Sequence, residues 1–266
     1  MTAEALTRQQ FLKEYRYIRH AEGRGSDCSE YYRALPLSSR TDPLFAMWSM
    51  RAKTYRYFEK RILEPIEATE KRPLDILDLG AGNCWLSHRL FSRGHRPVAI
   101  DIFSDERDGL RAARHYPNAF PTIEGNFDQL PLPSQSVDMA IFNASVHYST
   151  DYIRTLSEIR RCLRPSGAVV ILDSPLYRCH EYGVRMVKEK HAEFLRRYGF
   201  PSNALASIEF LDMPMLRMLE QQLRITWTTY KPWYGWRWHV RPFTAFLRRR
   251  RPPSRFWILT GRFHGQ

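Results

Sequence analysis

The sequence predicts an α/β fold with a doubly wound, mostly parallel sheet and helices on both of its faces. Short apolar stretches alternate with amphipathic stretches between residues 72 and 175. This alternation is typical of parallel strands joined by crossover helices. The first apolar stretch, 74–79, ends in the tight turn Gly80-Ala81-Gly82, and an amphipathic pattern follows at once. A chain of 266 residues is long enough to bury such a sheet in one large domain.

The elements follow in three parts. Residues 1–71 predict a helical cap, with helical spacing over 8–19 and over 44–66. The core, residues 72–175, predicts strands near 75–79, 97–101, 120–124, 137–143 and 168–173, and helices near 85–93, 106–115 and 150–163. Residues 176–266 predict a helix over 181–198 that ends at Gly199, a helix near 212–223, and β-rich runs at 224–230 and 255–260. We expect the three parts to form one integrated domain.

The turn after the first strand predicts a ligand site. Glycines at 80 and 82 let a ligand approach bare backbone, and the following helix start offers free N–H groups. Asp101 closes the next apolar run about twenty residues later, where a nucleoside ribose needs a carboxylate. A dinucleotide site has a third glycine where this chain has Trp85. S-adenosylmethionine (SAM), which has no pyrophosphate, is therefore favoured over NAD, and an ordinary βα turn is the alternative.

Three later segments carry a resemblance to a family. They are 124–133 (EGNFDQLPLP), 136–143 (SVDMAIFN) and 163–173 (LRPSGAVVILD). With the glycine turn, they resemble class I SAM-dependent methyltransferases over residues 72–175, in particular the methyltransferase type 11-like group. Asn126, Cys84 and Ser166 depart from the family pattern, which usually has Asp at the first position and Gly at the other two. Asn126 keeps a side-chain oxygen that can accept a hydrogen bond from an adenine amino group.

The resemblance implies a Rossmann-like, seven-stranded sheet with SAM as its cofactor. The two β-rich runs are then its final antiparallel pair, and 231–254 is an insertion between them. Asp101 is expected at the ribose, Asn126 and Phe127 beside the base, and Asn143 under the methionine moiety. The cofactor residues expected from the resemblance are Asp78, Gly80, Ala81, Gly82, Asp101, Ile102, Asn126, Phe127 and Asn143. For Ile102 and Phe127, core packing is the alternative.

Catalytic candidates follow the fourth strand. His147 has an intrinsic pKa that suits it to take a proton from a hydroxyl or amine, and Tyr148 is the substitute. The alternative for His147 is a histidine that only holds the turn. We expect no metal, because SAM is already activated and the four cysteines show no CxxC pair. Six residues of the cap are suited to a lid over the site: Tyr15, Arg19, Tyr31, Tyr32, Arg51 and Tyr55.

These residues predict a methyltransferase that acts on a hydroxyl, amine or carbon of a small organic or lipid-like acceptor. The sequence at Asn143 lacks the prolines of base-amine methyltransferases, and the chain has no Pro-Cys of the kind used at cytosine C5. An RNA methyltransferase is therefore the second interpretation, and a non-catalytic SAM-binding protein is the third.

The charge of the chain indicates an anionic partner. The net charge is +13, and arginines and aromatic residues gather in 231–254. Such a segment suits contact with an anionic membrane surface or with single-stranded nucleic acid, and a solvated helical cover is the alternative. No apolar run is long enough to span a membrane, and no secretory signal is visible. We expect a cytoplasmic protein with reduced thiols that is able to lie at a membrane surface.

Overall fold

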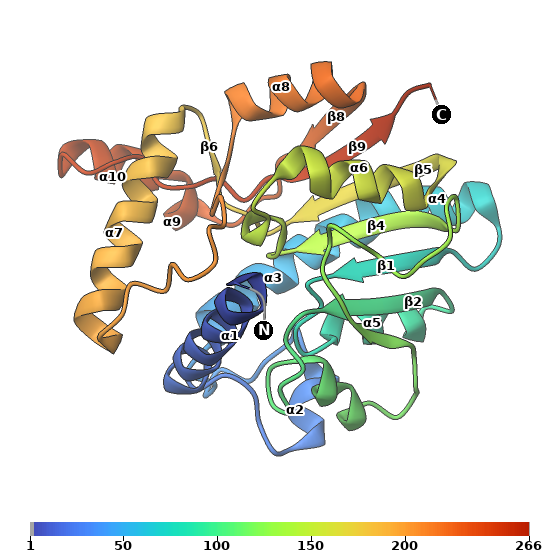
Figure 1. Cartoon of the computed structure of the whole chain (residues 1–266), viewed down its shortest axis with the longest axis horizontal. Helices are drawn as coiled ribbons and strands as arrows, with labels where there is room; N and C mark the ends of the chain where they lie inside the picture. The colour runs from blue at the N-terminus through green and yellow to red at the C-terminus, as the bar shows by residue number, and fades with distance from the viewer. Residues whose placement is uncertain (1–2, 266) are drawn as a thin grey trace.

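A computed structural model describes residues 3–265 of the chain (Figure 1). Residues 1, 2 and 266, which the predicted terminal parts include, lie outside the described residues. A seven-stranded sheet with the order β3-β2-β1-β4-β5-β9-β8 forms the centre, as the resemblance implied. The main strands are β1 (Asp75–Leu79), β2 (Arg96–Asp101), β3 (Thr122–Glu124), β4 (Val137–Asn143), β5 (Leu163–Leu172), β8 (Ile225–Tyr230) and β9 (Ile258–Phe263). A separate two-stranded pair joins β6 (Leu176–Tyr177) to β7 (Leu211–Asp212) in parallel.

The direction of the strands confirms a mostly parallel sheet. β1, β2, β3, β4 and β5 pair in parallel, whereas β9 runs antiparallel to both β5 and β8. β1 and β4 are buried along nearly their whole length, as expected for strands covered by helices on both faces. In Figure 1, β1 and β4 point toward α1 and α3, so the carboxyl ends of these strands meet the N-terminal helices.

Helices cover both faces of the sheet. Trp48, Phe58 and Leu90 pack with the β1 and β4 side chains of one face, and Leu156 and Leu219 pack on the other. The helices are α1 (Ala3–Ala21), α2 (Ser29–Ala34), α3 (Phe45–Phe58), α4 (Glu64–Glu70), α5 (Trp85–Ser92), α6 (Tyr152–Cys162), α7 (His180–Tyr198), α8 (Met213–Leu223), α9 (Trp236–His239) and α10 (Arg241–Leu247), with short helical turns η1 (Glu59–Leu63), η2 (Leu110–His115) and η3 (Val146–Tyr148). Among the described residues, no helix is both long and apolar enough to cross a bilayer.

The prediction of a helix over 106–115 is wrong in its first part. Only 110–115 is helical, as the tighter turn η2. The Asp105 carboxylate accepts hydrogen bonds from the backbone N–H groups of Arg107 and Asp108, at 2.9 and 3.1 Å. This local pattern stabilises a loop in place of the first helical turns. The strands expected at 120–124 and 255–260 also shift, to 122–124 and 258–263, and β5 starts at Leu163.

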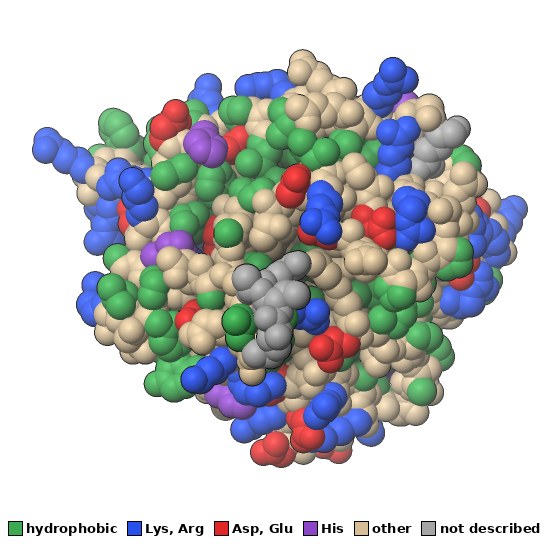
Figure 2. Space-filling model, viewed as in Figure 1, with side chains coloured by type: hydrophobic (Ala, Val, Ile, Leu, Met, Phe, Trp, Pro, Cys, Tyr) green, Lys and Arg blue, Asp and Glu red, His purple; other side chains and the backbone are tan. Residues whose placement is uncertain are grey.

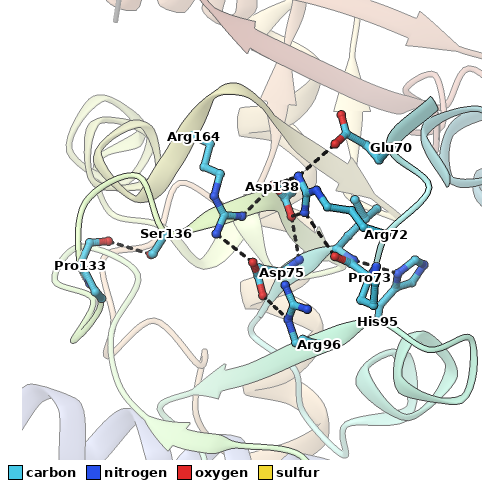
Figure 3. A network of polar contacts seen from close by, with 11 residues as sticks. Glu70, Arg72, Pro73, Asp75, His95, Arg96, Pro133, Ser136, Asp138 and Arg164 are labelled. Carbon is cyan, nitrogen blue, oxygen red and sulfur yellow. Dashed lines mark hydrogen bonds and ion pairs between the residues drawn. The ribbon is translucent and has the colours of Figure 1, made fainter.

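An ion-pair network holds the amino ends of four neighbouring strands together, at the edge opposite the carboxyl ends of β1 and β4 (Figure 3). Asp138 of β4 accepts from Arg72 and Arg164 at 2.7–2.9 Å and from the Asp75 backbone N–H at 2.8 Å. Asp75 of β1 pairs in turn with Arg96 of β2 and with Arg164 of β5. Burial opposes ionisation of Asp138, but these donors hold its pKa well below the ordinary value. The network fixes the amino ends of these strands, and their carboxyl ends are free of it.

Candidate functional site

One cavity of about 550 Å³ opens at the carboxyl ends of β1, β2 and β4. Its size lies in the ordinary range for a small-molecule site. Eight of the nine predicted cofactor residues line this cavity, and so do both catalytic candidates. These residues are Gly80, Ala81, Gly82, Asp101, Ile102, Asn126, Phe127, Asn143, His147 and Tyr148. Helices α1 and α3 supply the opposite wall.

The glycine turn has the geometry that the sequence predicts. Gly80 and Gly82 have φ angles of +70° and +53°, in the left-handed region that side chains disfavour. A Cβ at Gly80 would lie 2.3 Å from the Cβ of Ser145, so this position is also sterically closed. At Gly82 nothing comes closer than 3.7 Å. The turn therefore presents bare backbone to the cavity at Gly82 and packs tightly at Gly80.

Asp101 is held in place by two backbone donors. Its Oδ2 accepts from the Gly82 N–H at 2.8 Å and its Oδ1 accepts from the Phe103 N–H at 2.9 Å. Burial raises the pKa of this carboxyl, while the two N–H groups act in the opposite direction. Each carboxylate oxygen has a further lone-pair direction, so the group can still accept from a pair of ribose hydroxyls. The carboxylate thus fits the ribose of SAM.

Asp78 is the one predicted cofactor residue that does not line the cavity. It is buried, and its Oδ2 accepts from the Ser87 N–H at 3.1 Å and from the Ser87 hydroxyl at 2.7 Å. Its Oδ1 has no hydrogen-bond partner among the described residues. Burial raises the pKa of this carboxyl to about 7. In this structure Asp78 ties the end of β1 to the start of α5 and supports the turn from behind.

The catalytic candidates stand side by side in η3. The rings of His147 and Tyr148 lie 4.6 Å apart, and His147 Nδ1 is 3.5 Å from the Ser174 hydroxyl. Burial lowers the pKa of His147, and the nearby cations Lys190, Arg51 and Arg19 act in the same direction, so that together they bring it to about 3. The imidazole is therefore neutral at physiological pH and only weakly basic. Burial also raises the pKa of Tyr148, so its phenol stays protonated.

One face of α1 covers the cavity. Arg8, Phe11, Tyr15 and Arg19 recur every three or four residues and all line the wall. Tyr15 packs edge-on against Tyr148 at 5.8 Å, and Arg19 pairs with Asp108 at 2.5 Å. These contacts fasten the helix to the core. Of the six lid candidates, Tyr15, Arg19 and Arg51 line the cavity, whereas Tyr31, Tyr32 and Tyr55 do not.

Five arginines line the cavity, and four of them have a carboxylate partner. Arg8 pairs with Glu124, Arg19 with Asp108, Arg24 with Glu22 and Arg154 with Asp128, at 2.5 to 3.9 Å. Arg51 of α3 has no ion pair or hydrogen bond within the part of the chain that the structure describes. Its guanidinium lies 5.2 Å from the ring centre of the buried Trp48. Arg51 is thus a cation available to an anionic group in the cavity.

Several wall residues were not predicted from the sequence. Asn83 comes from the loop after β1, Trp85 from the start of α5, Phe103 and Asp108 from the loop after β2, and Trp48 and Arg24 from the cap. The first four lie within seven residues of a predicted site residue, and that proximity is the only signal for them. No group of three His, Cys, Asp or Glu side chains in residues 3–265 is arranged to hold a metal ion.

Comparisons with known proteins agree with this geometry. Residues 77–171 match the family model of a methyltransferase domain. An uncharacterized methyltransferase of Mycobacterium tuberculosis is 30% identical over 155 residues, which are 58% of each chain. A malonyl-[acyl-carrier protein] O-methyltransferase of Erwinia pyrifoliae is 29% identical over 123 residues, 46% of this chain and 45% of that protein. The chain therefore spans about half the length of these relatives.

Solved structures show the same fold at low sequence identity. The YcgJ protein of Bacillus subtilis has a TM-score of 0.53 and 15% identity, with 76% of this chain and 98% of that one covered. The PH0226 protein of Pyrococcus horikoshii has a TM-score of 0.51 and 17% identity, with 88% and 98% covered.

Proposed function

Residues 77–171 of this chain are a class I SAM-dependent methyltransferase domain, and from this premise we propose that the chain transfers the methyl group of SAM to a small organic or lipid-like acceptor. One observation carries the proposal. A single cavity joins the Asp101 and Gly82 side, which fits a nucleoside, to a side walled by aromatic residues of α1 and η3. Cofactor and acceptor would thus share one enclosed space.

The cofactor side has residues suited to the ribose, the adenine and the carboxylate of SAM. Asp101 would accept from the ribose hydroxyls, and Ile102, Asn126 and Phe127 would flank the adenine. We propose that Arg51 binds the carboxylate of the methionine moiety. That carboxylate is the only anionic group of the cofactor, and Arg51 is the wall arginine without a carboxylate partner among the described residues. Burial lowers the pKa of Arg51, so an anion beside it would relieve an unfavourable charge.

When bound, SAM supplies a methyl group already activated by its sulfonium. The chain has to orient the acceptor and exclude water. Phe11 and Tyr15 of α1 pack edge-on against Tyr148, so these three rings line one side of the cavity. His147 is placed to accept a hydrogen bond or a proton from the acceptor, and the protonated phenol of Tyr148 is the substitute for the hydrogen bond.

The low pKa of His147 favours an acceptor that is acidic. A base with a pKa of about 3 does not remove a proton from an ordinary alcohol at neutral pH. An oxygen acceptor that arrives ionised needs no base. The malonyl-[acyl-carrier protein] relatives are named for O-methylation, which supports an oxygen acceptor here. The proposal also includes a hydroxyl, amine or carbon acceptor, and His147 would then orient it by accepting its hydrogen bond.

We also propose a cytoplasmic location. The four cysteines are free, and two of them, Cys84 and Cys162, are buried in the core, as in a protein of a reducing compartment.

Calorimetry with S-adenosylhomocysteine (SAH), the demethylated cofactor, tests the proposal. We expect binding by the wild type and a loss of about 1–3 kcal/mol in Asp101→Ala, the scale of hydrogen bonds to a charged group. Glu106→Ala, an exposed acid of the same loop, is the control and should bind as the wild type does. Equal binding by Asp101→Ala and wild type would contradict the assignment.

A screen with SAM carrying a labelled methyl group then identifies the acceptor. Label found only on RNA would support the second interpretation. SAH binding without transfer to small acids, phenols, amines, lipids or RNA would support a non-catalytic SAM-binding protein.

A further inference from the structure

The segment between β8 and β9 exposes large apolar side chains to solvent. Trp236 and Phe246 are each 77% exposed, and Phe243 and Leu247 are each 64% exposed. Trp236, Val240, Phe243 and Leu247 recur at spacings of four, three and four along α9 and α10, which is the spacing of one helix face. We call these four residues and Phe246 the outer apolar face.

The opposite side of the same segment is anchored to the domain. Trp238 packs against Tyr234 and Phe256, with ring centres 5.1 and 5.4 Å away, and the Arg241 guanidinium lies on its ring at 3.2 Å. Arg241 also donates to the Ser254 carbonyl at 2.8 Å. Buried Tyr234 hydrogen-bonds to Thr54 of α3 at 2.9 Å. The segment therefore has an inner side fixed by specific contacts, and no part of residues 3–265 covers the outer apolar face.

The charge around this face is of one sign. Residues 221–266 contain nine arginines and one lysine but no aspartate or glutamate. Arg248, Arg249 and Arg250 follow α10 directly and are all exposed. Within the described residues, Arg251 is the cation of this run with an ion pair, to Glu189 of α7. Figure 2 shows basic side chains projecting beside hydrophobic ones at the left of the molecule, where Figure 1 places α10.

We propose that α9, α10 and Arg248–Arg250 form a peripheral binding surface for a bilayer of anionic lipid. An amphipathic helix with aromatic and aliphatic residues on its outer side and arginines at its edge is the arrangement that lies in the headgroup region. Single-stranded nucleic acid fits less well, because Val240 and Leu247 have no ring on which a base could stack. The surface lies outside the cavity, so the proposal is independent of the methyltransferase assignment.

Vesicle co-sedimentation tests the surface without cofactor or acceptor. The probes are vesicles of phosphatidylcholine alone and of phosphatidylcholine with 30% phosphatidylglycerol, and an unstructured RNA in a gel shift. We expect binding to the anionic vesicles that weakens as salt rises. Each arginine near an anionic surface strengthens binding about fivefold, so Arg248→Gln/Arg249→Gln/Arg250→Gln should weaken it about 100-fold. Trp236→Ser/Phe246→Ser should weaken binding to the anionic vesicles by tenfold or more.

Two matched controls separate this surface from net charge and from general hydrophobicity. Arg56→Gln/Lys60→Gln/Arg61→Gln removes three exposed cations at the end of α3 and in η1, and Leu195→Ser removes an exposed apolar side chain from α7. Both should bind vesicles within threefold of the wild type. An equal loss in the control triple would overturn the proposal, as would a wild type that binds RNA but not anionic vesicles, or neither probe. Unchanged circular dichroism of the variants excludes misfolding as the cause.

Discussion

Arg51 gives the sharpest test of the cofactor site, because SAH has a chemical relative that lacks the relevant group. 5′-Methylthioadenosine keeps the adenine, ribose and sulfur but has no amino-acid carboxylate. If Arg51 binds that carboxylate, Arg51→Met should weaken SAH by about 1.5–3 kcal/mol, the range for hydrogen bonds to charged groups. This corresponds to a roughly 10- to 150-fold higher Kd. The affinity for methylthioadenosine should change by less than threefold.

The same substitution has a second, opposite consequence. Burial lowers the pKa of Arg51, with Arg24 and Arg19 acting in the same direction and Asp173 and Asp108 acting against them. An unpaired, largely buried cation destabilises the protein without ligand, and an apolar residue of similar length removes that penalty. We therefore expect Arg51→Met to raise the Tm of the ligand-free protein or leave it unchanged, while it reduces the SAH-induced rise in Tm.

Calorimetry with both ligands and thermal unfolding with and without SAH complete the test. Arg51→Lys keeps the charge but not the planar fork, and should recover part of the SAH affinity. An equal loss of SAH and methylthioadenosine would mean that Arg51 supports the shape of the cavity. Unchanged SAH binding would mean that Arg51 does not bind the cofactor carboxylate, and our assignment would be wrong.

Three further predictions concern the turn, the ion-pair network and the histidine. Gly80→Ala should lower the Tm more than Gly82→Ala. Both substitutions strain the backbone by about 1–2 kcal/mol, but only the first places a Cβ 2.3 Å from the Cβ of Ser145. Equal Tm values for the two variants would refute this. Asp138→Asn should cost about 2–3 kcal/mol of unfolding free energy in urea at pH 7, and because the folded pKa is depressed, the difference from wild type should shrink as the pH falls below about 4. His147 has a folded pKa of about 3 against about 6.5 unfolded, so the unfolded state binds more protons in that window. As the pH falls from 6.5 to 4, the unfolding free energy of His147→Gln should therefore decrease less than that of the wild type, by about 1 kcal/mol per pH unit. Parallel plots of unfolding free energy against pH would show that the ring is not buried as described. In an acceptor assay the same variant should lower turnover about 100-fold if His147 takes a proton, with SAH affinity unchanged.

The core and its cofactor side could be predicted because their signals are local. A buried strand, a turn that requires positive φ and a carboxylate about twenty residues later all lie within one βαβ unit. The structure confirms the sheet, the final antiparallel pair and the insertion between its strands. The helix expected at 106–115 failed for an equally local reason. Asp105 takes the N–H groups of the residues that follow it, and composition alone did not reveal this competition.

The wall formed by the cap could be predicted only as a set of suitable residue types. Tyr15 and Tyr32 look alike in the sequence, but Tyr15 lines the cavity whereas Tyr32 is fully buried and hydrogen-bonded to the backbone of Ser26 and Arg107. Which of them faces the cavity depends on how α1 and α2 dock on the core, and that is set by contacts far apart in the chain. The pairing of Arg19 with Asp108 across 89 residues is one example. Asp78 shows the opposite case, since its carboxylate accepts from Ser87 and does not line the cavity, and its role at the cofactor stays a prediction.

The electrostatics of the cavity connect the cofactor side to the choice of acceptor. Arg19 and Arg51 help to lower the pKa of His147 because a positive field disfavours a second cation. The same field lowers the pKa of any acid bound beside the histidine, since it stabilises the anion. For a carboxylic acid or phenol bound there, this effect opposes the rise in pKa that burial causes, as Arg19 does at Tyr148. Binding of the cofactor carboxylate to Arg51 would offset part of that field, and the sulfonium would add to it. An acidic oxygen acceptor is complementary to the positive field that acts on His147. An amine would arrive as an ammonium ion, which the same field disfavours, and it would have to lose its proton before its lone pair could attack.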